Sequence, residues 1–140
     1  MRFVCLQENL QKALLLVNRV ISQKAQLPVL SNTLLVAKNN SLSLLATDLE
    51  LGIKIEVPAK IEREGEITVS GKIFLDLVST LPPEKIEIEV NETTLILKTK
   101  NQKATLAGIP AVEFPQFADK KGGLILNAEG NTLKKNIRAI

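Results

Sequence analysis

Residues 27–57, LPVLSNTLLVAKNNSLSLLATDLELGIKIEV, contain the pattern on which the fold prediction depends. Three runs have the length and composition of strands: 31–36, 41–47 and 51–57. Asn39-Asn40 separates the first two runs, and asparagine tolerates the positive φ angles of a tight hairpin. Between the second and third runs, Asp48 can hydrogen-bond the backbone of a turn. The segment therefore predicts a three-stranded antiparallel meander with one buried face.

This pattern occurs twice in the chain. Residues 41–53 align with residues 94–106 at a constant shift of 53 residues. The hairpin at Asn39-Asn40 then falls beside Asn91-Glu92. Because identity between the copies is low, two unrelated meanders could match equally well. Whether the chain contains a true repeat therefore depends on the segments that precede each meander.

A strand and a helix are expected before each meander. Residues 8–22 have one apolar face at helical spacing, made of Leu10, Ala13, Leu14, Val17, Val20 and Ile21. A shorter helix is expected at 71–81, with Phe74, Leu77, Val78 and Leu81 inward and Pro82-Pro83 after it. With strands at 2–6 and 66–69, the order is β-α-β-β-β over residues 1–57 and again over residues 66–109, while 58–65 is a charged connector. The sequence predicts an α+β fold with a duplicated β-α-β-β-β unit, its two helices packed on antiparallel sheets.

The end of the chain is expected to begin a further copy. Residues 119–123, DKKGG, have the composition of a linker. A strand at 124–126 and a helix at 131–140 follow, as at the start of the chain. We expect a first domain at 1–118, a linker at 119–123 and the truncated start of a second domain at 124–140.

Composition argues against an enzyme. The 140 residues include no histidine, and the sequence has neither a glycine-rich phosphate loop nor a Cys/His metal cluster. No catalytic residue, metal or cofactor is therefore expected. The single cysteine, Cys5, fits a reducing compartment, and no apolar run approaches the length of a signal peptide or a membrane span. A soluble, cytoplasmic protein with no membrane partner is expected.

Charge is distributed unevenly. Residues 1–38 contain five Lys or Arg and one Glu, whereas residues 48–92 contain five basic and eleven acidic side chains. Residues 93–140 contain eight basic and three acidic side chains. A polyanion would therefore meet particular faces of the molecule.

At several positions the chain resembles the DNA polymerase III beta subunit family, the bacterial DNA sliding clamps. The residues that carry the resemblance are Phe3, 10–17, LPVLSN at 27–32, ATDLE at 46–50, VSGK at 69–72, Leu81-Pro82 and GIPAVEFP at 108–115. The resemblance covers the family's amino-terminal domain and the opening of its second domain.

The resemblance implies a homodimeric ring with three such domains in each subunit. Helices would line the hole and sheets would form the outer wall. The ring would encircle duplex DNA, without reading its sequence, and tether the replicative polymerase, so its activity in DNA replication would be topological. Polymerase and clamp loader would bind through domains outside these residues. The alternative is a stand-alone clamp-like interaction module that forms no ring.

A sliding contact needs positive charge toward phosphates without a fixed base register. Candidate DNA-binding residues are Lys12 and Arg19 on the first helix, Lys24 in its loop, and Lys72 on the second helix. The resemblance places Lys24 at a basic loop position that reaches the DNA backbone. Each could instead be a solvated surface charge.

The resemblance also places a subunit interface at a sheet edge. Lys98, Lys103 and Ala104 occupy that region, and the family often has a bulkier apolar residue where Ala104 stands. The alternative is that lysines at an exposed edge only prevent aggregation.

Overall fold

The computed structural model describes residues 1–21, 31–47 and 52–114, together with the backbone of 123–127. Its helices are α1 (Gln7–Val17), α2 (Gly71–Ser79) and the short 3₁₀ helix η2 (Ala111–Glu113). Its strands are β1 (Arg2–Leu6), β2 (Asn32–Lys38), β3 (Ser41–Thr47), β4 (Gly52–Pro58), β5 (Lys60–Arg63), β6 (Gly65–Ser70), β7 (Lys85–Asn91), β8 (Thr94–Lys98), β9 (Lys103–Ile109) and β10 (Gly123–Asn127). The predicted order is confirmed, because β1-α1-β2-β3-β4 recurs as β6-α2-β7-β8-β9.

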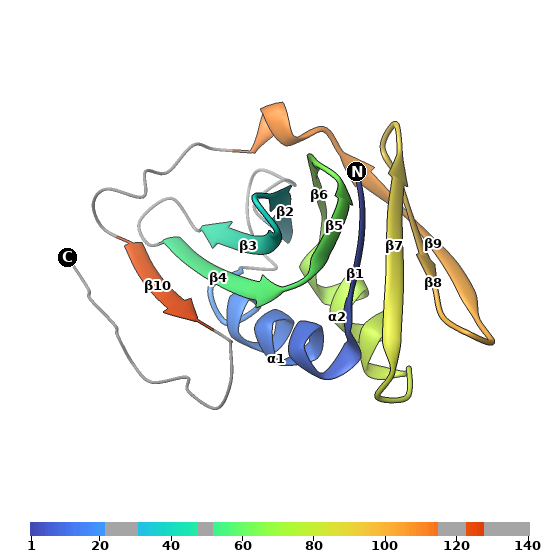
Figure 1. Ribbon diagram of the computed structural model, residues 1–140. Helices are drawn as coiled ribbons and strands as arrows, with labels where there is room; N and C mark the ends of the chain where they lie inside the picture. Colours follow the sequence, from blue (N-terminus) through green and yellow to red (C-terminus); the bar gives the residue numbers. More distant parts are fainter. Residues whose placement is uncertain (22–30, 48–51, 115–122, 128–140) are drawn as a thin grey trace.

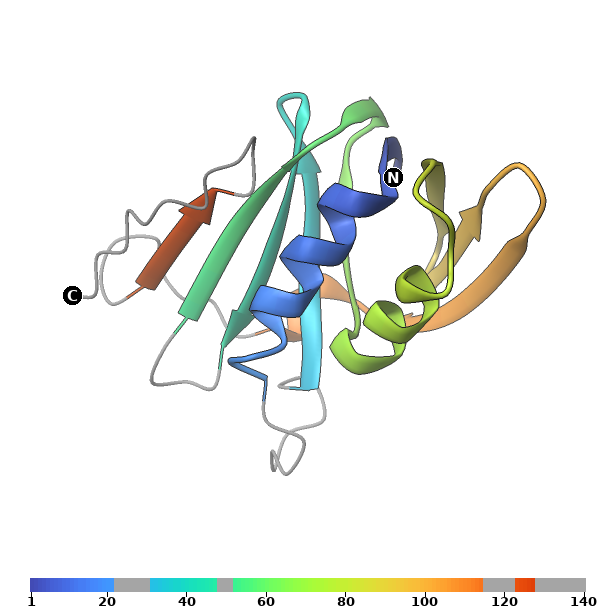
Figure 2. The same ribbon diagram turned by 90° about the horizontal axis from the view of Figure 1, so that it is seen from below.

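Across the sheet, hydrogen-bonded strands lie side by side in the order β10-β4-β3-β2-β6-β9-β8-β7-β1-β5. The last three strands of each repeat form an antiparallel run that the first strand of the other repeat extends, since β6 pairs with β2 and β1 pairs with β7. The pairing of β6 with β9 joins the two runs. This junction is narrow, since its register contains only Thr68 opposite Ile109 and Val69 opposite Gly108. The two runs diverge from it, and both helices lie on the same side of the strands (Figure 1, Figure 2).

The core lies between the helices and the inner faces of the strands. Leu10, Ala13, Leu14 and Val17 of α1 are fully buried, as are Phe74 and Val78 of α2. Strand β7 alternates cleanly, with Ile86 and Ile88 buried and Glu87 and Glu89 on the outer face. The predicted apolar faces of the helices are therefore confirmed, and β7 has one buried face and one face toward solvent.

The predicted hairpin between β2 and β3 is confirmed at the level of dihedral angles. Asn39 has φ 51° and Asn40 has φ 61°, as a two-residue hairpin requires. Glu92 occupies the matching turn between β7 and β8 with φ 58°. Both repeats thus have a two-residue hairpin turn, but both turn residues have positive φ in the first and only Glu92 does in the second.

Two boundaries differ from the sequence prediction. The connector expected at 58–65 contains strand β5, which pairs with β1 through Val4 opposite Lys60. The sequence did not predict this strand because its residues are mostly charged, although charged side chains are typical of an edge strand. Helix α1 ends at Val17 and not at residue 22, because the Asn18 side chain donates to the carbonyl of Leu14 at 2.7 Å and closes the last turn.

Strand β10 coincides with the strand expected at 124–126 and pairs in parallel with β4, with Leu124 opposite Ile53. The turn at 48–50, the residues 22–26 that contain Lys24, and the helix expected at 131–140 lie outside the described residues. The assignment of 124–140 to a second domain stays a prediction.

Candidate nucleic-acid interface and sheet edge

Helices α1 and α2 run antiparallel, and hydrogen bonds hold them together at both ends. Gln7 is buried at the start of α1 and donates its Nε2 to the carbonyl of Val78 at 2.8 Å. At the other end, Asn18 Nδ2 donates to the carbonyl of Gly71 at 3.1 Å. Gly71 permits this approach, since a Cβ there would lie 2.4 Å from Ile21 Cδ1 and 2.9 Å from Asn18 Oδ1.

Local sequence fixes where each helix begins. Ser70 caps α2 by accepting a hydrogen bond at its Oγ from the Ile73 amide at 3.3 Å. Helix α1 has no side-chain cap, but the Gln7 amide donates to the carbonyl of Glu84 at 2.9 Å. A hydrogen bond thus fixes the first turn of each helix where the helix follows a strand, and this sets the angle at which the helix leaves the sheet.

The predicted DNA-binding residues of the helices are exposed on the side away from the core. Lys12, Arg19 and Lys72 are all exposed, and none has an ion-pair partner among the described residues. Because the end of α1 lies beside the start of α2, Arg19 and Lys72 are at the same end of the helix pair. Lys12 lies nearer the other end, and Lys24 is outside the described residues.

The helix surface also contains negative and apolar side chains. Glu8 and Asp76 are exposed on the same two helices, so the field of the helix pair is only weakly positive. Leu15 is 50% exposed and Ile73 is 51% exposed. Neither residue belongs to the buried helix faces that the sequence predicted.

Strand β9 presents an open edge. Residues 103–107 pair with β8 on one side, whereas β6 contacts β9 only at Gly108 and Ile109. Gly108 allows the crossing, since a Cβ there would lie 2.6 Å from the carbonyl oxygen of Thr68. Among the described strands, no partner therefore covers 103–107 on the side facing away from β8.

The predicted interface residues lie at this edge but do not share one face. Lys103 is exposed on the outer face, opposite Lys98 of β8. Ala104 follows it and is half-buried on the side of Leu106, which packs against the core. Lys98 lies one strand in from the open edge, so only Lys103 and Ala104 belong to the edge strand itself.

One arginine ties together the neighbouring strands β7, β1 and β5 on their outer face. Arg2 of β1 donates to Glu87 of β7 through Nε at 2.9 Å and Nη2 at 2.6 Å. Its Nε also lies 3.0 Å from a carboxylate oxygen of Glu62 in β5. The hydrogen bond to Glu87, with the charges of Glu87 and Glu62, raises the pKa of Arg2. Sequence pattern alone did not connect these three strands.

Nothing in the described residues suggests catalysis. Burial raises the pKa of the Cys5 thiol to about 12, so this cysteine stays protonated and unreactive near neutral pH. Within the ranges that the structure describes, no three His, Cys, Asp or Glu side chains are grouped so that they could hold a metal ion. The described helices are also too short or too polar for a membrane span.

Comparison with known proteins identifies the family. The family model for the N-terminal domain of the DNA polymerase III beta subunit matches residues 1–118. Among curated proteins, the beta sliding clamp of Pseudomonas putida is 38% identical over 142 residues, covering 98% of this chain and 38% of the relative. That of Synechococcus elongatus is 35% identical over 141 residues, covering 99% of this chain and 38% of the relative.

Solved structures give the same result. The DNA polymerase III subunit beta of Pseudomonas aeruginosa aligns with a TM-score of 0.81 at 38% identity, covering 89% of this chain and 34% of that one. The Caulobacter crescentus protein aligns with a TM-score of 0.81 at 29% identity, covering 86% of this chain and 34% of that one. The chain thus spans little more than a third of the length of these relatives. It belongs to the DNA polymerase III beta subunit family, whose N-terminal domain matches residues 1–118.

Proposed function

We propose that this chain is part of a DNA sliding clamp, a processivity factor whose full-length protein forms a homodimeric ring around duplex DNA and tethers the replicative polymerase. The observation that carries the proposal is that one duplicated unit has both an exposed helix layer and an open sheet edge. A domain of this kind can be repeated edge to edge, and its helices then all face the same side. The function is topological, so no residue of the chain acts as a catalyst.

The helix layer is the surface that faces DNA. Lys12, Arg19 and Lys72 are exposed and unpaired among the described residues, so their ammonium and guanidinium groups can follow phosphates while the backbone of the duplex moves past. Lys24 would add a contact from the loop after α1. Flexible cations of this kind give affinity without sequence readout, which a sliding contact requires.

The open edge of β9 is the surface that contacts a second subunit. An unpaired strand edge presents backbone amide and carbonyl groups that another strand can pair with. Lys103 on the edge and Lys98 beside it add positive charge, and Ala104 leaves room for an apolar side chain of the partner. A complementary partner edge would therefore be acidic and apolar.

The remaining parts of the proposal concern the full-length protein. We assign residues 1–118 to a first domain, 119–123 to a linker and 124–140 to the start of a second domain. Replicative polymerase and clamp loader would bind parts that lie outside this chain, and the protein would work in the cytoplasm. One relative, the Helicobacter pylori beta clamp, has been solved with a DNA ligase peptide bound.

Retention on DNA of different topology tests the ring. Full-length protein loaded by its clamp loader onto a nicked circular plasmid should co-elute with the DNA in gel filtration, even in high salt. Cutting the plasmid once with a restriction enzyme should release it, because a ring slides off a free end. Equal retention on circular and linear DNA would contradict a topological mechanism.

A further inference from the structure

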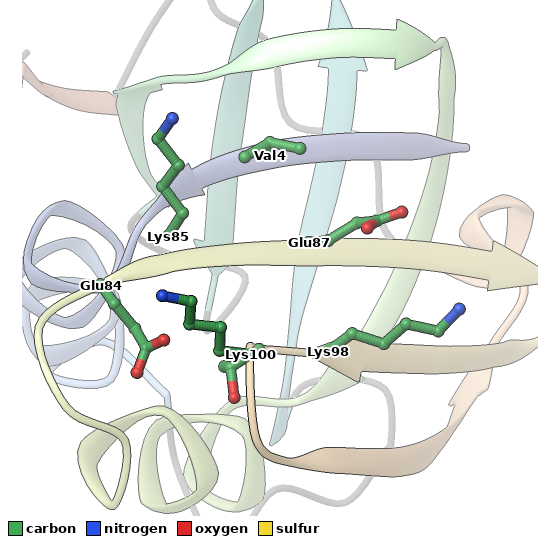
Figure 3. A pocket seen from close by; sticks show the side chains of 7 residues that line it. Val4, Glu84, Lys85, Glu87, Lys98 and Lys100 are labelled. Atoms are coloured by element: carbon green, nitrogen blue, oxygen red, sulfur yellow. The ribbon is translucent and has the colours of Figure 1, made fainter.

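The outer face of the run β9-β8-β7-β1-β5 contains a hollow of about 560 Å³, formed by β1, the start of β7, and β8 with the loop after it (Figure 3). It lies on the side of the strands opposite the helices, because the neighbours of its lining residues, Cys5, Ile86 and Leu97, point into the core. Its volume falls within the usual range of ligand sites, about 300–1,000 Å³. The helix layer and the DNA path proposed above do not use this face, whereas the subunit contact proposed above shares Lys98 with it.

Positive charge dominates the hollow. Lys85, Lys98 and Lys100 line it, and none of the three has an ion-pair partner among the described residues. Of the two acidic side chains in its wall, Glu87 is already bound by Arg2 at 2.6 Å. Only Glu84 remains to offset three ammonium groups.

The positions of the charges suit an extended ligand. Figure 3 shows the ends of Lys98 and Lys100 pointing in opposite directions, with Lys85 on the far side of β7 from both and Val4 on β1 on that same far side. The loop after β8 is ordered by two hydrogen bonds, from the Thr99 amide to the Gln102 carbonyl at 2.9 Å and from the Gln102 amide to Thr99 Oγ1 at 3.1 Å. The backbone that carries Lys100 is therefore held in place, and the cations lie on both sides of β7 without meeting at one point.

We propose that this hollow is a docking site for an acidic peptide segment of a partner protein. An apolar side chain of the segment would rest on Val4 and the aliphatic stems of the lysines, and its carboxylates would reach Lys85, Lys98 and Lys100. A nucleic-acid strand fits less well, because its evenly spaced phosphates would also face Glu84, whereas a peptide can place its carboxylates opposite the lysines alone. The proposal does not depend on ring formation.

Peptide binding measured by fluorescence anisotropy tests this site. The probe is a fluorescein-labelled peptide, Asp-Leu-Glu-Asp-Leu-Glu, at low ionic strength, and its matched control is the same peptide with Asn and Gln in place of Asp and Glu. The acidic peptide should bind at least about tenfold more tightly than the amide peptide, since several exposed charge pairs act together.

Charge reversal locates the binding. The double variant Lys85→Glu/Lys100→Glu should weaken binding of the acidic peptide by about tenfold or more, because each change removes an attraction and adds a repulsion. Lys38→Glu, which changes an exposed lysine at the end of β2 in the other run of strands, should leave binding unchanged. Both lysines of the double variant are exposed, and the milder Lys85→Gln/Lys100→Gln variant should give a smaller loss in the same direction.

Three results would overturn the proposal: no binding of the acidic peptide, equal binding of the amide peptide, or unchanged binding by the double variant. Tighter binding of a hexathymidylate strand that is itself lost in the double variant would assign the hollow to nucleic acid instead.

Discussion

At the scale of single residues, the two repeats differ most clearly in the turn of their matching hairpins. Asn39 and Glu92, the first residues of the two turns, both have positive φ, 51° and 58°, but asparagine is enriched several-fold in this region and glutamate is not. Glu92→Asn should therefore raise the free energy of unfolding by about 0.5–1 kcal/mol, measured by urea denaturation. The reciprocal change Asn39→Glu should lower it by a similar amount. A loss of stability in Glu92→Asn would mean that the glutamate side chain contributes more than its backbone strain costs.

Gly108 permits the junction between the repeats. A Cβ at this position would lie 2.6 Å from the Thr68 carbonyl oxygen and 3.0 Å from Ile67 Cγ1, and the first of these is backbone that cannot rotate away. Gly108→Ala should destabilise the protein by about 1–3 kcal/mol, as overpacking does. Thr105→Ala, an exposed change on the same strand, should stay within about 0.5 kcal/mol. Thermal unfolding of the two variants side by side measures the difference.

Cys5 gives a prediction about pH. Burial raises the pKa of its thiol from 9.0 to about 12 in the folded protein, so the folded state keeps a proton that the unfolded state releases. The resulting stability is complete below pH 9 and is lost as pH rises toward 12. The stability difference between wild type and Cys5→Ala should therefore shrink above pH 9, by at most about 1.4 kcal/mol per pH unit. A difference that stays constant between pH 8 and 11 in chemical denaturation would contradict the burial argument.

At the scale of elements, helices and hairpins could be predicted well from the sequence, whereas edges could not. Local periodicity placed Leu10 and Phe74 in the core, and the Asn39-Asn40 dipeptide placed a hairpin. Strand β5 was missed because its charged residues carry no apolar alternation, and its pairing with β1 is a long-range contact. The exposed positions of Lys12, Arg19 and Lys72 could be predicted, because a helix has a fixed period. The hollow at Val4 could not, because its wall joins strands far apart in the sequence.

The open edge of β9 predicts an effect of charge on subunit association. Lys98→Glu/Lys103→Glu should weaken dimerisation of the full-length protein by about tenfold and reduce its dependence on salt, because both changes act at the rim of the proposed contact. Sedimentation equilibrium at two salt concentrations measures this. Lys85→Glu, on the same outer face but two strands from the edge, should leave the dimer intact. An equal effect of both variants would place the subunit contact elsewhere.

At the scale of the whole molecule, one such domain cannot surround a duplex. The exposed helix charges nearly cancel, with Lys12, Arg19 and Lys72 set against Glu8 and Asp76. The isolated chain should therefore bind a short linear duplex only weakly, and added salt should abolish that binding. Fluorescence anisotropy with a labelled duplex measures it. Tight binding that resists salt would show a DNA site independent of encirclement.

The pairing of β1 also has a consequence for synthesis on the ribosome. Both partners of β1 are made after it: Phe3 lies opposite Ile61 of β5 and opposite Ile88 of β7. At about 5–20 residues per second, roughly 4–17 s pass between the translation of Phe3 and that of Ile88. During that interval β1 is an apolar strand that cannot complete its pairing. Residues 2–6 therefore reach their native position only after many later residues have been made, and a chaperone that holds nascent apolar segments would act on them.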